Sequence, residues 1–166
     1  MRRRLLLVAL GLVCASSAAA LDLPARKAGL WDIRMTPDGG NVPPQTMQQC
    51  VDTATDKLMN GFGENAKPDM CPRQDVKKVG NTIVVDTLCR IDAITIASHG
   101  VITGDFNSAY TLKVTTRREG GPPEAGPGGA ASVTIEAKWS GPCKTDHKPG
   151  DLIMPNGVKM NIRDLL

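Results

Sequence analysis

The stretch Tyr110-Thr-Leu-Lys-Val-Thr115 decides the fold class, because apolar and polar side chains alternate along it. A second stretch, Val133-Thr-Ile-Glu-Ala-Lys-Trp139, alternates in the same way. Alternation with a period of two is typical of a β-strand that has one buried face and one exposed face. Both stretches are therefore predicted to be strands of an antiparallel sheet.

Other segments have weaker strand patterns, at residues 30–35, 83–89 and 94–104. The dipeptide Asn156-Gly157 favours a tight turn, which predicts a small hairpin made of residues 152–154 and 158–162. Together these elements predict a mainly β protein with an antiparallel sheet of roughly six to eight strands, sandwich-like or forming a partly closed barrel.

One short helix is expected near residues 53–61. Thr53 and Asp56 have the spacing of a capping box, in which the hydroxyl and the carboxylate each accept a backbone N–H of the first turn. Gly61 is a residue that commonly ends a helix. The helix is predicted to pack on the sheet or to plug one end of it.

A Pro/Gly-rich segment lies between the two firmest strands, at residues 119–130. It contains few side chains that could be buried, and its prolines and glycines disfavour a regular ladder. We therefore expect a flexible hairpin loop there.

The first twenty residues have the composition of an export signal. Three arginines precede an apolar run from Leu5 to Val13, which is too short to span a bilayer, and Ala18-x-Ala20 resembles a cleavage site. Residues 1–20 are predicted to be a cleaved signal peptide, and residues 21–166 a single domain that is periplasmic or secreted. Cys14 follows Val13, which is not a small residue, so lipidation at Cys14 is not expected.

The charge of the chain argues against nucleic-acid binding. Removing the three signal arginines from the 20 Lys and Arg leaves 17, which equals the 17 Asp and Glu. A neutral domain with few aromatic residues lacks the basic surface and the stacking side chains that nucleic-acid binding requires.

Four cysteines remain after the signal: Cys50, Cys71, Cys89 and Cys143. An even number of cysteines in an exported protein favours two disulfides over free thiols or a metal site, and the chain has no Cys-x-x-Cys pair. Three pairings are possible, and the sequence does not choose among them. We favour Cys71 with Cys89 and Cys50 with Cys143.

The sequence offers no catalytic or metal-binding motif. Ser98 and His99 are neighbours, but adjacent residues of a strand point to opposite faces, so a turn at His99 and Gly100 is the preferred interpretation. His147 lies near Cys143, Asp146 and Asp151 without the spacing of a defined metal motif, and a solvated loop is expected there. No catalytic residue, cofactor or metal is predicted.

The aromatic residues suggest two arrangements. Trp31 and Trp139 are the largest apolar side chains of the first and the last long strand, and they are expected to meet in the core. Alternatively, they line a cavity between sheet and helix, with Tyr110 and Phe106 near its mouth. Such a pocket could hold a small apolar ligand.

Several short motifs are spread along the chain after the signal. They are Gly29-Leu-Trp-Asp-Ile33, Gln49-Cys50, Met70-Cys71, Gly80-Asn81, Gly104-Asp-Phe106, Trp139-Ser-Gly-Pro-Cys143 and Pro149-Gly-Asp151. In these motifs the chain resembles the exported bacterial proteins of domain of unknown function family 3617. The resemblance implies an exported protein and carries no activity that could be assigned to a residue.

Two hypotheses for function follow. In the first, the protein is non-enzymatic and its curved sheet binds a small apolar or amphiphilic ligand. In the second, it is an interaction module whose sheet edge or 119–130 loop contacts another protein of the cell envelope. An enzyme is the third interpretation, without a residue to support it.

Overall fold

The computed structural model describes residues 23–39, 42–60, 70–121 and 129–164. The predicted signal peptide and part of the Pro/Gly-rich loop lie outside these ranges. The described elements are β1 (Gly29–Pro37), β2 (Gln45–Val51), α1 (Thr53–Asn60), β3 (Arg73–Val79), β4 (Thr82–Ile91), β5 (Ile94–Asp105), β6 (Ala109–Gly120), β7 (Gly129–Gly141), β8 (Asp151–Ile153), β9 (Lys159–Asn161) and the 3-10 helix η2 (Ile162–Asp164).

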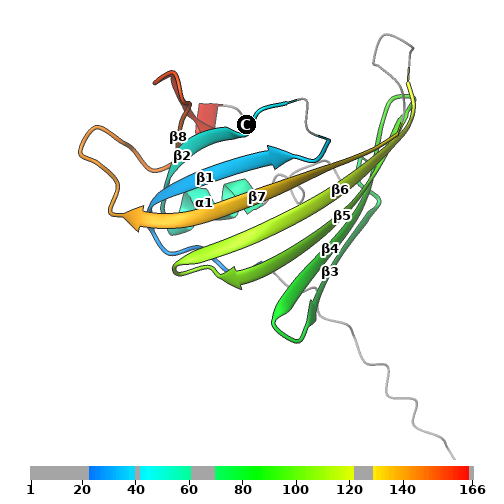
Figure 1. Ribbon diagram of the computed structural model, residues 1–166, viewed down its shortest axis with the longest axis horizontal. Coiled ribbons are helices and arrows are strands. Elements are labelled where there is room, and N and C mark those ends of the chain that lie inside the picture. The colour runs from blue at the N-terminus through cyan, green and yellow to red at the C-terminus, as the bar shows by residue number, and fades with distance from the viewer. Residues whose placement is uncertain (1–22, 40–41, 61–69, 122–128, 165–166) are drawn as a thin grey trace, which may run out of the picture.

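All nine strands belong to one antiparallel sheet, in the order β3-β4-β5-β6-β7-β1-β2-β8-β9 (Figure 1). The predicted mainly β fold with an antiparallel sheet and one short helix is therefore confirmed. The sheet is a single layer that stays open, because β3 and β9 at its two ends do not pair with each other. Within the described ranges, no helix is both long enough and apolar enough to span a membrane.

Two strands, β2 and β3, were not predicted, and their composition explains why. β2 reads Gln-Thr-Met-Gln-Gln-Cys-Val and β3 reads Arg-Gln-Asp-Val-Lys-Lys-Val, so neither alternates over its length. The predicted C-terminal hairpin is present as β8 and β9, and Gly157 takes a positive φ of 81° in its turn.

The strand register gives the sheet two distinct faces. On the inner face, Trp31 of β1 lies opposite Trp139 of β7, and Ile33 lies opposite Ala137, which in turn pairs with Tyr110 of β6. The buried core consists of Trp31, Ile33, Val51 and Ala137, with Met35, Met47, Tyr110, Ile135 and Trp139 packed against it. The polar residues that alternate with these on the same strands form the outer face.

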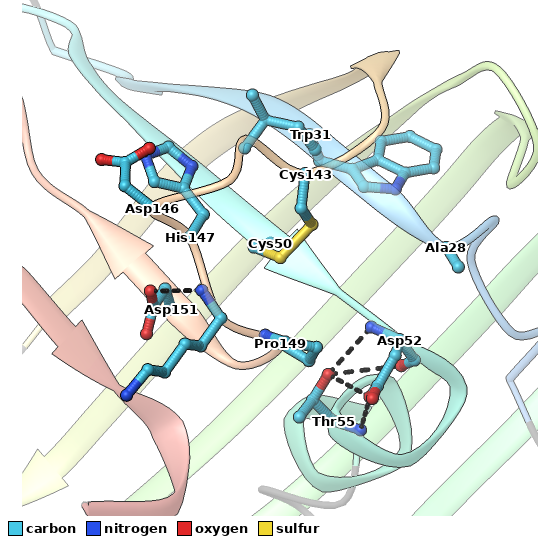
Figure 2. The surroundings of a disulfide bond; sticks show 12 residues. Ala28, Trp31, Cys50, Asp52, Thr55, Cys143, Asp146, His147, Pro149 and Asp151 are labelled. Atoms are coloured by element: carbon cyan, nitrogen blue, oxygen red, sulfur yellow. Dashed lines mark hydrogen bonds and ion pairs between the residues drawn. A yellow bond between two sulfur atoms is a disulfide. The ribbon is translucent and has the colours of Figure 1, made fainter.

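Helix α1 lies on the inner side of the sheet, behind β1 and β7 in Figure 1. Its N-terminal turn is capped by Asp52, whose Oδ1 accepts a hydrogen bond from the Thr55 backbone N–H at 2.8 Å (Figure 2). The hydrogen bonds from Thr55 hold the pKa of Asp52 below its usual value. The predicted capping pair of Thr53 and Asp56 is wrong, because the Asp56 carboxylate is buried and binds Arg26 instead.

Two disulfides join parts of the chain that are separated in sequence. Cys50 at the end of β2 pairs with Cys143 after β7, with the Cα atoms 5.5 Å apart. Cys71 before β3 pairs with Cys89 of β4. These are the pairs favoured on the sequence.

Candidate functional site

The aromatic residues proposed as a pocket lie together on the inner side. The rings of Trp31 and Tyr110 are 5.7 Å apart and tilted, and Phe106 stacks on Tyr110 at 4.9 Å. Trp139 packs against the same core. Because Trp31 is fully buried, these rings form a filled aromatic cluster.

The chain segment before β1 covers this aromatic cluster. The indole N–H of Trp31 donates to the carbonyl of Lys27 at 2.8 Å, and that of Trp139 donates to the carbonyl of Ala28 at 3.1 Å. The Lys27 ammonium lies 3.5 Å from the centre of the Trp139 ring, which is cation–π geometry. Both tryptophans thus hold residues 27–28 in place, and a ligand among them would have to displace that segment.

A buried ion pair joins the same segment to helix α1. The Nε of Arg26 donates to Asp56 Oδ1 at 2.6 Å, and the Arg26 backbone N–H donates to Oδ2 at 2.8 Å. Arg26 also donates to the side-chain oxygen of Gln49 at 2.7 Å, and its guanidinium lies 6.0 Å from the centre of the Trp31 ring. Both charged groups are therefore buried with hydrogen-bonding partners, as a stable ion pair requires.

Tyr110 lies next to this ion pair. Burial raises the pKa of its phenol, while the charge of Arg26 and a hydrogen bond from it act in the opposite direction. The phenol is therefore protonated at neutral pH and is not a base. The aromatic cluster and the ion pair together behave as a structural anchor.

A groove of about 820 Å³ lies on the outer face and crosses β6, β7, β1 and β2. We call it the outer groove. Its apolar wall is Ile153, Met154 and Pro155. Ile153 ends β8, which pairs with β2 in the sheet, and Met154 and Pro155 come directly after it. Its hydroxyl groups come from Thr46, Thr103 and Thr111.

Four charged side chains from β1 and β7 line the middle of the outer groove. Asp32 lies opposite Lys138 in the register, and Arg34 lies opposite Glu136. Asp32 accepts a hydrogen bond from the side-chain amide of Gln48 at 2.7 Å. None of the four charged groups forms an ion pair within 4 Å among the described residues. Opposite charges thus face each other across β1 and β7, and the four charges sum to zero.

Of the four aromatic residues proposed from the sequence, Trp31, Trp139 and Phe106 are not among the lining residues of the outer groove. Tyr110 is among them, but its ring lies in the aromatic cluster on the inner face. Sequence reasoning missed the groove because it treated the polar positions of each strand as solvent-facing. The alternation itself was the available signal, but only the register shows which polar residues become neighbours.

A smaller groove of about 440 Å³ lies further along the outer face, over β3 to β6. There His99 Nδ1 lies 2.7 Å from Asp86 Oδ1. The turn predicted at His99 and Gly100 is wrong, because both residues lie within β5. Ser98 points to the opposite face, where its hydroxyl lies 3.3 Å from that of Thr116, so Ser98 and His99 form no dyad.

His147 is the second histidine, and the expectation of a solvated loop is wrong for its ring. Only 5% of the His147 side chain is exposed, and the ring lies near the Cys50–Cys143 disulfide (Figure 2). Its Nε2 is 3.7 Å from Asp146 Oδ1, which is an ion-pair distance only if the ring is protonated. In the part of the chain that the structure describes, no three His, Cys, Asp or Glu side chains are grouped to hold a metal ion.

Comparison with known proteins gives one match. A family model described as a protein of unknown function, DUF3617, matches residues 26–143. This span runs from Arg26 of the buried ion pair to Cys143 of the long-range disulfide, and it includes β1 to β7. No curated protein and no solved structure matches the chain. The match covers well over half of the chain, which therefore belongs to the DUF3617 family.

Proposed function

We propose that the protein binds a small amphiphilic molecule in the outer groove. The observation that carries the proposal is the combination of an apolar wall with charged side chains in one groove of about 820 Å³. Ligand sites for small molecules typically enclose about 300–1,000 Å³ and combine apolar surface with a few polar groups that fix orientation.

The arrangement of the lining suggests how such a molecule would lie. Its apolar part would contact Ile153, Met154 and Pro155 at one side of the outer groove. Its polar part would reach the charged ends of Arg34 and Lys138, which have no ion-pair partner within 4 Å in the described ranges. The inner side is less suitable, because residues 26–28 already cover its aromatic cluster.

The molecule would be bound in the outer groove without a chemical reaction. A hydroxyl becomes a nucleophile only beside a base that can take its proton. Among the described residues, neither histidine lines the outer groove, and its threonines have no hydrogen bond to a carboxylate. The groove therefore offers recognition and no activated nucleophile.

We also propose that the protein acts after export. Two disulfides are typical of proteins that fold in an oxidising compartment, such as the periplasm or the exterior of the cell. The motif pattern of residues 1–20 supports the same location.

The test is native mass spectrometry of the protein purified from its own compartment, followed by denaturation to identify any bound molecule. We expect a chain that begins near Leu21 and carries one small amphiphilic molecule. Thr111→Trp should remove the ligand, because Thr111 lines the outer groove on β6. The matched control is Lys113→Trp, two residues along the same face of β6 and outside the groove lining.

Two results would contradict this function. One is a protein of apo mass from every preparation, which would favour a protein–protein interaction module. The other is a ligand retained equally by both variants, provided that their melting temperatures match that of the unmodified protein. A ligand lost from Thr111→Trp alone would place the binding site at the groove.

A further inference from the structure

Strand β3 forms an open edge of the sheet. It pairs with β4 on one side, and in the described part of the chain no strand pairs with its other side (Figure 1). An edge strand presents a row of backbone N–H and C=O groups that can pair with another strand. The opposite edge, β9, has only three residues, whereas β3 has seven and is long enough to serve as a template.

The β3 edge is also held firmly in place. Seven register pairs join it to β4, from Arg73 opposite Leu88 to Val79 opposite Thr82. Just before β3, the backbone N–H of Arg90 donates to the carbonyl of Met70 at 2.6 Å, and the Cys71–Cys89 disulfide follows. An edge fixed in this way loses little conformational entropy when a partner strand is added.

The sequence of β3 is complementary to itself when it is read antiparallel about Val76. In that register Asp75 of one copy lies opposite Lys77 of the second copy, and Lys77 lies opposite the second copy's Asp75. Val76 lies opposite the second copy's Val76 at the two-fold axis. Opposite charges in directly facing positions stabilise a pair of strands, and like charges destabilise it.

We propose that two copies of this protein associate through their β3 edges, forming one continuous antiparallel sheet across a two-fold axis. Asp75 and Lys77 lie on the same face of β3. The inner face of one copy therefore continues into the inner face of the second copy, and the outer faces join in the same way. An isologous contact of this kind is the usual basis of a homodimer. The inference does not depend on the function proposed for the outer groove.

Lysines at a sheet edge usually prevent pairing between strands, and β3 has two of them. In the proposed register Lys77 meets an aspartate and Lys78 meets Gln74, so neither lysine faces another cation. A hydrogen bond from Arg73 Nε at 2.8 Å, together with the charges of Arg73 and Lys77, lowers the pKa of Asp75. Asp75 is thus anionic at neutral pH, as the contact requires.

Analytical ultracentrifugation of the mature, oxidised protein tests the interface by charge exchange. We expect a concentration-dependent dimer, with Kd raised about 10- to 100-fold by Asp75→Lys or by Lys77→Asp, since each places like charges opposite at two symmetric contacts. The double variant Asp75→Lys/Lys77→Asp should restore the original Kd. Lys113→Asp, which makes the same change within the sheet on β6, is the control and should leave Kd unchanged.

Circular dichroism and thermal melting of each variant exclude unfolding as the cause. A monomer at all concentrations overturns the proposal. So do single variants that dimerise like the unmodified protein, and so does a double variant that is as weak as the singles. None of these results would contradict ligand binding in the outer groove, because Asp75 and Lys77 do not line that groove.

Discussion

Replacing Asp56 by alanine should strongly destabilise the protein, because it removes one partner of the buried ion pair with Arg26. Asp56 is fully buried, and its two carboxylate oxygens accept two hydrogen bonds from Arg26. The Arg26 side chain is only 6% exposed, so water cannot readily replace the lost carboxylate. The substitution leaves a buried cation and a backbone N–H without their principal acceptor.

The expected loss follows from this burial. Removing one partner of a buried ion pair typically costs about 3–5 kcal/mol, because the other charge stays buried without compensation. In Arg26 the contact with Gln49 persists, which favours the lower part of that range. Replacing both partners by apolar residues, as in Arg26→Met/Asp56→Leu, should recover much of the stability.

Urea unfolding followed by tryptophan fluorescence measures the effect, because Trp31 lies beside Arg26 in the core. Glu119→Ala is the control, since it removes an ion pair with Arg117 in which both side chains are about 70% exposed, and it should cause no measurable loss. A loss below about 1 kcal/mol for Asp56→Ala would refute the idea that the ion pair fixes the segment before β1.

Two further predictions concern the disulfides and the helix cap. Removing the Cys50–Cys143 disulfide by a double alanine substitution should cost more than removing Cys71–Cys89, by about 1–2 kcal/mol in urea unfolding, because its loop of 93 residues constrains the unfolded chain more than a loop of 18. The pKa of Asp52 is lower in the folded protein than the value of 3.8 expected for the unfolded chain. The cap therefore contributes its full stabilisation above pH 3.8, and this stabilisation is lost as the pH falls through the folded pKa. Stability in Asp52→Ala should therefore be lower by about 1 kcal/mol at pH 7 and should fall less on acidification, as thermal melting across pH 2–7 would show.

Much of the sheet could be predicted from the sequence, because its central strands bury one face each. The alternation at Tyr110 to Val114 and at Val133 to Trp139 corresponds to β6 and β7. β3 could not be found this way, because an edge strand that is charged along most of its length buries too little to show a period. β2 lacks alternation because glutamines occupy positions on both of its faces.

The candidate site was harder to predict, because its residues become neighbours only through the strand register. Arg34 and Glu136 are about 100 residues apart in sequence and directly opposite in the sheet. Asp56 illustrates the same limit for the helix. Its spacing from Thr53 suggested a local cap, whereas a cation 30 residues earlier in the chain is its partner.

The pairing of β1 with β7 imposes an order on folding. Trp31 lies in β1, the first strand of the described residues, whereas its neighbour Trp139 follows about 100 residues later, and pairing between segments so far apart in sequence is slow to form. The hairpins from β3 to β7 can assemble beforehand from local contacts. One edge of β1 must therefore stay unpaired until β7 is available. The Cys50–Cys143 disulfide can form only after that, because Cys143 follows β7 in the chain.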